Sequence, residues 1–167
     1  MNKVFFDLEW NTGFLDGNSF DEIIEIGAVK TDEEYRQIDG FRRLIRPVIY
    51  RKMNPYIQKI LAITMKDLQG EEPLAAVAKA FFDWCGNCDT LIAWSGNDFG
   101  VLEKNLAHIG MKIPEQLGRY DVQMAYAYRT ENSIRNYALK TAVEAMELPE
   151  PEGQEYHDAY CDAQFTA

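Results

Sequence analysis

The sequence is poor in cysteine and contains no long apolar run. Three cysteines among 167 residues, an odd number, argue against a disulfide framework and fit a reducing compartment. No apolar run approaches the ~20 residues that a membrane-spanning helix requires, and no basic start with an apolar core indicates a signal peptide. We therefore expect a cytoplasmic protein with no membrane partner.

Lysine and arginine are also scarce. Seventeen basic residues stand against 27 acidic ones, and the net charge is −10. This balance argues against a protein that coats nucleic acid through a broad basic surface. It does not exclude an enzyme that holds a short stretch of chain through metal ions, because several carboxylates would then be metal ligands.

Two of the cysteines, Cys85 and Cys88, have the spacing of half a zinc site. A structural zinc site needs four ligands, and no second pair or nearby histidine completes this one. We interpret the pair as a buried cysteine at the end of a helix beside a cysteine at the surface.

The composition indicates one folded domain. Hydrophobic residues make up 47 % and charged residues 26 % of the chain, which are ordinary values for a globular protein. No internal repeat or flexible linker divides the sequence. We therefore expect one domain over residues 1–167.

Apolar and β-branched residues predict three strands in the first third of the chain, at residues 3–8, 22–30 and 35–46. The first strand is expected to break at Trp10 to Gly13, and Thr31 to Glu34 are expected to form the turn between the other two. Consecutive strands of this kind predict an antiparallel meander.

The remainder of the chain alternates strands with helices. Short strands are expected at 90–94 and 118–122, and helices at 53–61, at 73–85, from about Asp98 to Ile109, from a cap at Ser133 to Ala145, and at 157–167. Three antiparallel strands followed by strand and helix alternation predict an α/β fold with a mixed sheet.

The first strand carries two carboxylates, Asp7 and Glu9, within the apolar run Val4 to Leu8. Residues two apart in a strand point to the same face, so the two side chains would lie next to each other. Like charges at that distance repel unless a cation lies between them. Paired carboxylates of this kind are typical of a site for a hard metal ion with oxygen ligands.

Three more residues could complete such a site. Asp98 follows a buried strand, although a carboxylate there is more often a first-turn acid favoured by the helix dipole. His157 and Asp162 do not share a helix face, but a histidine before a helix and an aspartate one turn into it would converge. Asp158 is an alternative ligand, although a first-turn acid is its simpler interpretation. The other histidine, His108, is interpreted as a surface or packed residue.

These segments resemble the three motifs of the DEDDh, or DnaQ-like, 3′–5′ exonucleases. In chain order they are Phe6-Asp7-Leu8-Glu9, Asn97-Asp98 and His157-Asp158-Ala159-Tyr160-Cys161-Asp162-Ala163. Each motif is weak alone, but three in this order over almost the whole chain are a strong signal. Within the family, the KapD-like and small-RNA-trimming branch is the most similar, on the basis of Arg46-Pro47, Ile63-Thr64 and Trp94 to Asp98.

The resemblance implies a single exonuclease domain with an RNase H-like fold. Its five-stranded mixed sheet would have three antiparallel strands, then two parallel ones, with helices on both faces. Relatives usually have a longer last helix, whereas this sequence stops at Ala167, so the helix is expected to be either short or truncated.

The resemblance also implies roles for the site residues. Asp7, Glu9, Asp98 and Asp162 would hold two Mg²⁺ or Mn²⁺ ions, which can serve both ends of an in-line displacement at phosphorus. His157 would act as the general base on the attacking water, because histidine accepts protons near neutral pH.

Substrate contacts are expected on both sides of these motifs. Trp10 could stack on a terminal base, although core packing is an equally good interpretation. Asn11, Thr12, Ile63 and Asn97 are the other substrate contacts that the resemblance implies. Leu61-Ala62 stands where that branch usually has a Thr-Gly pair, so the grip on the substrate is expected to differ.

The sequence thus predicts a metal-dependent 3′–5′ exonuclease. It would bind the 3′ end of single-stranded RNA or DNA and release nucleoside 5′-monophosphates. One alternative is an oligoribonuclease-like enzyme that acts on very short oligonucleotides. Another is a catalytically idle domain that binds nucleic acid or a protein.

Overall fold

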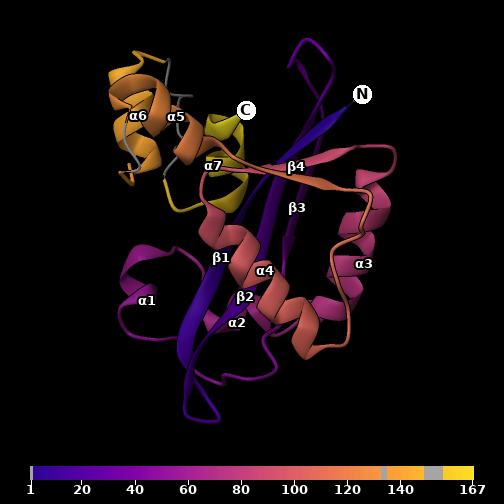
Figure 1. Ribbon diagram of the computed structural model, residues 1–167. Helices are drawn as coiled ribbons and strands as arrows, with labels where there is room; N and C mark the ends of the chain where they lie inside the picture. Colours follow the sequence, from indigo (N-terminus) through magenta and orange to yellow (C-terminus); the bar gives the residue numbers. More distant parts are fainter. Residues whose placement is uncertain (1, 133–134, 149–155) are drawn as a thin grey trace.

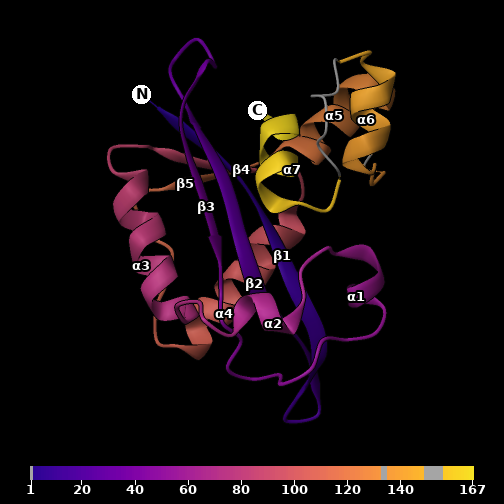
Figure 2. The ribbon, with the colours of Figure 1, turned by 180° about the vertical axis from the view of Figure 1, so that it is seen from behind.

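The computed structural model describes residues 2–132, 135–148 and 156–167. A five-stranded sheet runs through its centre in the order β3-β2-β1-β4-β5 (Figures 1 and 2). The strands are β1 (Lys3–Leu15), β2 (Asn18–Thr31), β3 (Gln37–Leu44), β4 (Thr90–Ala93) and β5 (Gly118–Asp121). β1, β2 and β3 pair antiparallel, and β4 and β5 join in parallel with β1. The predicted mixed sheet is confirmed.

The first strand is longer than the sequence pattern predicted. β1 does not break at Trp10 but continues to Leu15 and forms a hairpin with β2, which begins at Asn18. The turn is Asp16-Gly17, and both residues have positive φ, 49° and 81°. A two-residue turn of this kind matches the right-handed twist of the strands. The prediction of a break was wrong because the polar residues 11–13 indicated a loop, whereas the Asp-Gly turn lies four residues further on.

The hairpin is irregular at the point where the carboxylates lie. Glu9 pairs with Glu25, but the next residue, Trp10, pairs with Ile23, so Ile24 is an extra residue on β2. Such a bulge bends the strand and redirects the side chains beyond it. Glu9 and Glu25 lie directly at this bend.

Helices cover both faces of the sheet (Figures 1 and 2). On one face, α3 (Leu74–Cys85) and α4 (Gly96–His108) enclose the largest core, which includes Phe6, Phe81 and Leu102. Cys85 and Cys88 are both buried in this core, so the expectation of a surface cysteine was wrong for Cys88. Among the described residues, no helix is both long enough and apolar enough to cross a bilayer.

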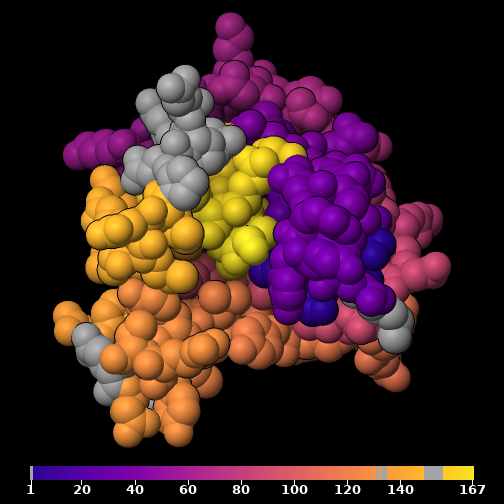
Figure 3. Space-filling view, turned by 90° about the horizontal axis from the view of Figure 1, so that it is seen from above, coloured from indigo at the N-terminus to yellow at the C-terminus, as the bar shows by residue number. Residues whose placement is uncertain are grey.

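The opposite face is covered by short helices. α1 (Ile57–Ile60) and α2 (Met65–Leu68) pack over Ile24, and α7 (Ala159–Thr166) lies across β1 and β2. Seen from above, α7 lies in the centre, between the end of the β2–β3 hairpin and the helices α5 (Val122–Glu131) and α6 (Leu139–Ala145) (Figure 3).

The helices differ from the prediction in four places. The helix expected at 53–61 is only the four residues of α1, because the preceding loop binds β1 through Asn54. α2 and α5 were not predicted. The helix expected from Ser133 begins at Leu139, and Ser133 and Ile134 lie outside the described residues.

The first turn of α7 lies directly against β2 at Gly27. A Cβ atom at Gly27 would lie 2.1 Å from the backbone nitrogen of Tyr160 and 2.2 Å from the carbonyl carbon of Ala159. Only glycine permits this approach of helix backbone to strand backbone. The sequence Glu25-Ile26-Gly27 therefore fixes where α7 lies.

Gly27→Ala is expected to lower the free energy of unfolding by about 2–3 kcal/mol, because the added methyl group overlaps backbone atoms that can move only with the whole helix. Urea unfolding measures this change. Gly70→Ala is the matched control: no atom lies within 4 Å of its Cβ position, and we expect a change within about 0.5 kcal/mol. Equal stability of the two variants would show that α7 is not held against β2.

Candidate active site

Asp7 and Glu9 lie on the face of β1 that α7 covers. Their neighbours Phe6 and Leu8 point the other way, into the main core, as the two-residue period of a strand requires. Asp7 pairs with Gly27, the residue that lies against α7, and Glu9 pairs with Glu25. The two carboxylates therefore face the start of α7.

Asp98 reaches the same place from the first turn of α4. The helix begins after Ser95, whose Oγ accepts a hydrogen bond from the backbone N–H of Asn97 at 3.2 Å. Only 4 % of Asp98 is exposed, and its backbone N–H donates to the carbonyl of Ser95 at 3.3 Å. The backbone of Leu8 lies close enough to the Asp98 carboxyl to oppose the rise of its pKa, which places this side chain of α4 beside β1.

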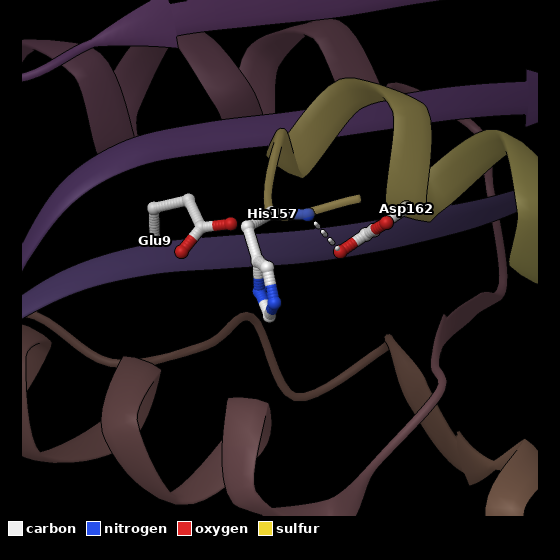
Figure 4. A group of neighbouring side chains, drawn as sticks. All are labelled: Glu9, His157 and Asp162. Atoms are coloured by element: carbon white, nitrogen blue, oxygen red, sulfur yellow. Dashed lines mark hydrogen bonds between the residues drawn. The ribbon is translucent and has the colours of Figure 1, made fainter. Parts of the chain in front are cut away.

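His157 and Asp162 lie around the N-terminus of α7. Asp158 caps the helix by accepting a hydrogen bond from the backbone N–H of Cys161 at 3.1 Å, so it is the N-cap residue and not an acid of the first turn. His157 has a left-handed backbone (φ 69°), and its backbone N–H donates to Asp162 Oδ2 at 3.2 Å. Figure 4 shows His157 between Glu9 on one side and Asp162 of α7 on the other.

All five predicted residues line one cleft of about 570 Å³. Within the part of the chain that the structure describes, ligand atoms of Glu9, His157 and Asp162 lie within 4.8 Å of one another (Figure 4). Asp7 and Asp98 line the same cleft but do not belong to this triad. The imidazole is thus as close to the carboxylates as a metal ligand would be.

Burial and mutual repulsion raise the pKa values of the four carboxyl groups. Burial is the main cause for each one. It raises the pKa of Asp7 well above its usual value, with added repulsion from Asp98, Asp162 and Glu9. The pKa of Glu9 rises to about 8 and that of Asp98 to about 7, in both cases with repulsion from Asp162. Asp162 itself is raised to about 6, although the hydrogen bond from His157 opposes the shift.

The cluster fits a divalent cation. Asp162 Oδ1 is buried and has no hydrogen-bond partner among the described residues, and a buried oxygen of this kind costs free energy unless something binds it. Carboxylate oxygens are the ligands that hard divalent ions prefer. A cation would remove the repulsion that raises these pKa values.

Without divalent ions, the free energy of unfolding is expected to fall as the pH rises from about 5 to about 8. An unfolded chain releases carboxyl protons near pH 4, whereas folded Asp162, Asp98 and Glu9 retain theirs up to about 6, 7 and 8. In this range the folded protein binds more protons than the unfolded chain, so a rising pH favours unfolding. The exposed carboxyls with lowered pKa values, Asp32 and Asp67, act in the opposite direction only below about pH 4.

Urea unfolding in EDTA, repeated between pH 5 and pH 8, measures this trend. Added Mn²⁺ is expected to raise the free energy of unfolding more at pH 8 than at pH 5, because the ion binds the deprotonated carboxylates of the folded state. A metal-free protein that becomes more stable over this range would contradict the prediction.

Only three of the five predicted substrate contacts line the cleft: Trp10, Thr12 and Asn97. Trp10 also packs against the main core, so its core-packing interpretation is confirmed, and its stacking on a base stays a prediction. Asn11 does not line the cleft: the residue is 1 % exposed, and its side chain bonds the carbonyl of Lys52 and the backbone N–H of Asn54. Ile63 lies in a neighbouring hollow that it shares with His157.

The sequence analysis missed an ion-pair network beside the cleft. Glu25 is completely buried and accepts a hydrogen bond from Arg42 Nε at 2.8 Å, and a second nitrogen of Arg42 bonds Asp158. Arg42 on β3 thus joins the buried carboxylate of β2 to the cap of α7. Strand alternation alone places Arg42 on the same face of the sheet as Glu25. Only the fold shows that Asp158, at the start of α7, lies within reach of Arg42.

Most of one wall of the cleft was also missed, and of its residues only Leu61 was singled out in the sequence. It comes from the segment between β3 and α2, which contributes Asn54, Tyr56, Ile57, Ile60 and Leu61. In the sequence, this segment is distinguished by its charge: positions 42–66 contain seven basic residues and no acidic one.

Comparison with known proteins agrees with this geometry. Residues 4–167 match the model of the RNase T family, described as Exonuclease. The PolC-type DNA polymerase III of Clostridium perfringens is 35 % identical over 112 residues, which are 66 % of this chain and 7 % of that protein. The chain therefore spans only a small part of that relative.

Two solved structures share the fold. The nuclease domain of 3′hExo, a DEDDh family member bound to rAMP, superposes with a TM-score of 0.79 at 16 % identity, over 98 % of this chain and 86 % of that one. Exonuclease I of E. coli in complex with a dT13 oligonucleotide gives a TM-score of 0.72 at 19 % identity, over 99 % and 39 % of the two chains. The likeness to the KapD-like branch stays a prediction. The family match over residues 4–167 shows that the chain belongs to the RNase T family of exonucleases, and its fold is the one seen in the DEDDh nuclease domain.

Proposed function

We propose that this protein is a metal-dependent exonuclease that removes nucleotides from the 3′ end of single-stranded RNA or DNA and releases nucleoside 5′-monophosphates. The observation that carries the proposal is the convergence of Asp7, Glu9, Asp98, His157 and Asp162 on one cleft. They come from three separate regions of the sequence. The exonuclease domain would comprise residues 1–167.

The four carboxylates would hold the metal ions, two Mg²⁺ or Mn²⁺. Their burial and their raised pKa values support this role, since without a cation the folded protein must protonate them or bear their repulsion. When bound, the ions would supply positive charge for the attacking and leaving oxygens of an in-line displacement.

His157 would accept the proton of the attacking water. Its side chain is exposed to the cleft, and its backbone is held by the hydrogen bond to Asp162. The imidazole is therefore held beside the carboxylates and open to solvent, as a general base must be. Because ligand atoms of His157, Glu9 and Asp162 lie within 4.8 Å of one another, His157 has metal ligation as its alternative role.

Aromatic side chains support binding of a terminal nucleotide in the cleft. Trp10, Tyr56 and Trp94 line it, and aromatic rings stack on any base, so such a site tolerates many sequences. Asn97 and Ser95 add polar groups at the start of α4. The similar structures, one bound to rAMP and one to a dT13 oligonucleotide, support the same class of ligand.

A gel time course tests the proposal. Single-stranded RNA and DNA 20-mers labelled at the 5′ end are incubated with Mg²⁺, Mn²⁺ or EDTA. We expect a ladder of products that shorten from the 3′ end when metal is present, and no change in EDTA. The strand that is degraded faster, RNA or DNA, shows which sugar the enzyme prefers. If neither strand shortens with metal present, the proposal for long substrates fails, and dinucleotides would test the oligoribonuclease-like alternative.

A further inference from the structure

The positive charge of this acidic protein is concentrated in one segment. Residues 42–66, here called the basic segment, hold seven of the 17 basic residues and no acidic one. The rest of the chain carries the other ten basic residues beside all 27 acidic ones. The net charge alone predicts few contacts with phosphates, but it conceals this distribution.

The basic segment is held to the sheet by backbone hydrogen bonds and by its apolar side chains, which pack over Ile24. The buried carboxylate of Glu22 accepts hydrogen bonds from the backbone N–H groups of Val48, Ile49 and Tyr50, at 2.6–2.9 Å. Asn11 bonds the carbonyl of Lys52 and the backbone N–H of Asn54. Because these contacts use main-chain atoms, the fold does not require the basic side chains for them.

Six of the seven basic side chains are therefore available to a ligand. They are exposed and form no ion pair among the residues that the structure describes: Arg43, Arg46, Arg51, Lys52, Lys59 and Lys66. Arg42 is the exception, since it pairs with Glu25 and Asp158. Several basic residues elsewhere, such as Lys79, Lys112 and Arg119, are paired with carboxylates.

The position of the segment connects this charge to the cleft. Asn54, Tyr56 and Ile57 form one wall of the cleft, and Arg46 and Arg51 line a hollow of about 310 Å³ further along the same segment. α2, which carries Lys66, lies on the sheet face opposite α4 (Figures 1 and 2). The unpaired positive charge thus extends outward from the cleft on one side of the molecule.

We propose that the basic segment binds the backbone of the single strand upstream of the nucleotide in the cleft, through Lys52, Lys59, Lys66, Arg46 and Arg51. This inference rests on the proposed function, since it assumes that a nucleic acid 3′ end occupies the cleft. A single strand that leaves the cleft over this wall meets uncompensated cations, whereas elsewhere it meets an excess of carboxylates. Phosphate contacts of this kind strengthen binding without reading sequence.

Two triple variants with equal charge changes test the proposal. Lys52→Gln, Lys59→Gln and Lys66→Gln remove three cations of the basic segment. Lys79→Gln, Lys104→Gln and Lys112→Gln remove three exposed lysines from α3, α4 and the loop after α4. Binding of 5′-fluorescein-labelled oligo(U) and oligo(dT) 20-mers is measured by anisotropy in EDTA at several salt concentrations, and hydrolysis of 20-mers and dinucleotides is measured with Mn²⁺.

For the first triple variant we expect binding of the 20-mer that is weaker by about tenfold, with a slope of log Kd against log salt that is smaller by about 2, at ~0.7 per phosphate contact. Turnover of dinucleotides should not change, because they are too short to reach the segment. The second triple variant should bind as the wild type does. Equal weakening in both variants, an unchanged slope, or no binding by the wild type would overturn the inference. Absence of hydrolysis by a wild type that binds the 20-mer would instead count against the proposed function.

Discussion

Asp98→Asn is expected to reduce exonuclease activity by at least ~1000-fold, or about 4 kcal/mol, while it raises the free energy of unfolding in EDTA at pH 8. Activity falls because the variant loses a carboxylate that we propose as a metal ligand. Stability rises because the buried Asp98 carboxylate is repelled by Asp162, which together with burial raises its pKa to about 7. A neutral amide of nearly the same size removes this repulsion.

Opposite changes in activity and stability are typical of a functional site that is strained for its chemistry. The matched control is Asp83→Asn, which removes an exposed carboxylate of α3 that pairs only with Lys79; both quantities should stay near the wild-type values. The gel assay and urea unfolding provide the two readouts. If the Asp98→Asn protein is folded and fully active, Asp98 is not needed for the reaction and its proposed role as a metal ligand is wrong.

His157→Gln is expected to lower kcat by about 100-fold to 10,000-fold, the usual contribution of a general base, and to leave the affinity for Mn²⁺ unchanged. Glutamine has nearly the same length but does not accept the proton of the attacking water at working pH. KM should change little, since the aromatic wall of the cleft is intact. His108→Gln, on the exposed end of α4 beside Phe20, is the control because the chain has only these two histidines.

Calorimetric titration with Mn²⁺ distinguishes the two roles that the geometry leaves for His157. A loss of affinity of tenfold or more in the variant would show that the imidazole is a ligand of the triad with Glu9 and Asp162, and not the base. Unchanged kcat and unchanged affinity together would exclude both roles.

Local patterns predicted the strands well, and the error at β1 has a physical cause. The apolar run of residues 4–8 indicates a buried strand, and this strand is present, with Phe5 buried on the face opposite Phe6. Beyond Trp10 the hairpin leaves the main core, and Phe14 near its end is exposed, so no apolar run marks the rest of the strand. Cross-strand hydrogen bonds and the Asp16-Gly17 turn maintain the strand there.

The helices were predicted less well where tertiary contacts outweigh propensity. The segment 53–61 contains good helix formers, but Asn54 bonds Asn11 and Thr12, which fixes an extended loop before α1. α6 begins only at Leu139, and the carbonyl of Tyr137 before it accepts hydrogen bonds from Trp94 and Gln123. Side-chain contacts between distant residues of this kind leave no periodic signal in a single sequence.

The candidate site was predicted more fully than its surroundings. Asp7 and Glu9 were recognisable because charges in an apolar strand are costly, and the three motifs singled out Asp98, His157 and Asp162 by order and spacing. The ion pair of Arg42 with Glu25 and Asp158 was not recognisable, since each residue alone is an ordinary charged residue of a strand or a helix start.

The sequence by itself thus determined the fold class, the face of β1 that carries the carboxylates and the identity of the five central residues, because strand alternation and motif order are local properties. Tertiary structure decided the rest. The approach of α7 to Gly27 brings His157 and Asp162 to β1, and the bonds of Glu22 and Asn11 place the basic segment along the cleft. These arrangements depend on contacts between residues that are far apart in the chain, and such contacts exist only once the sheet has formed.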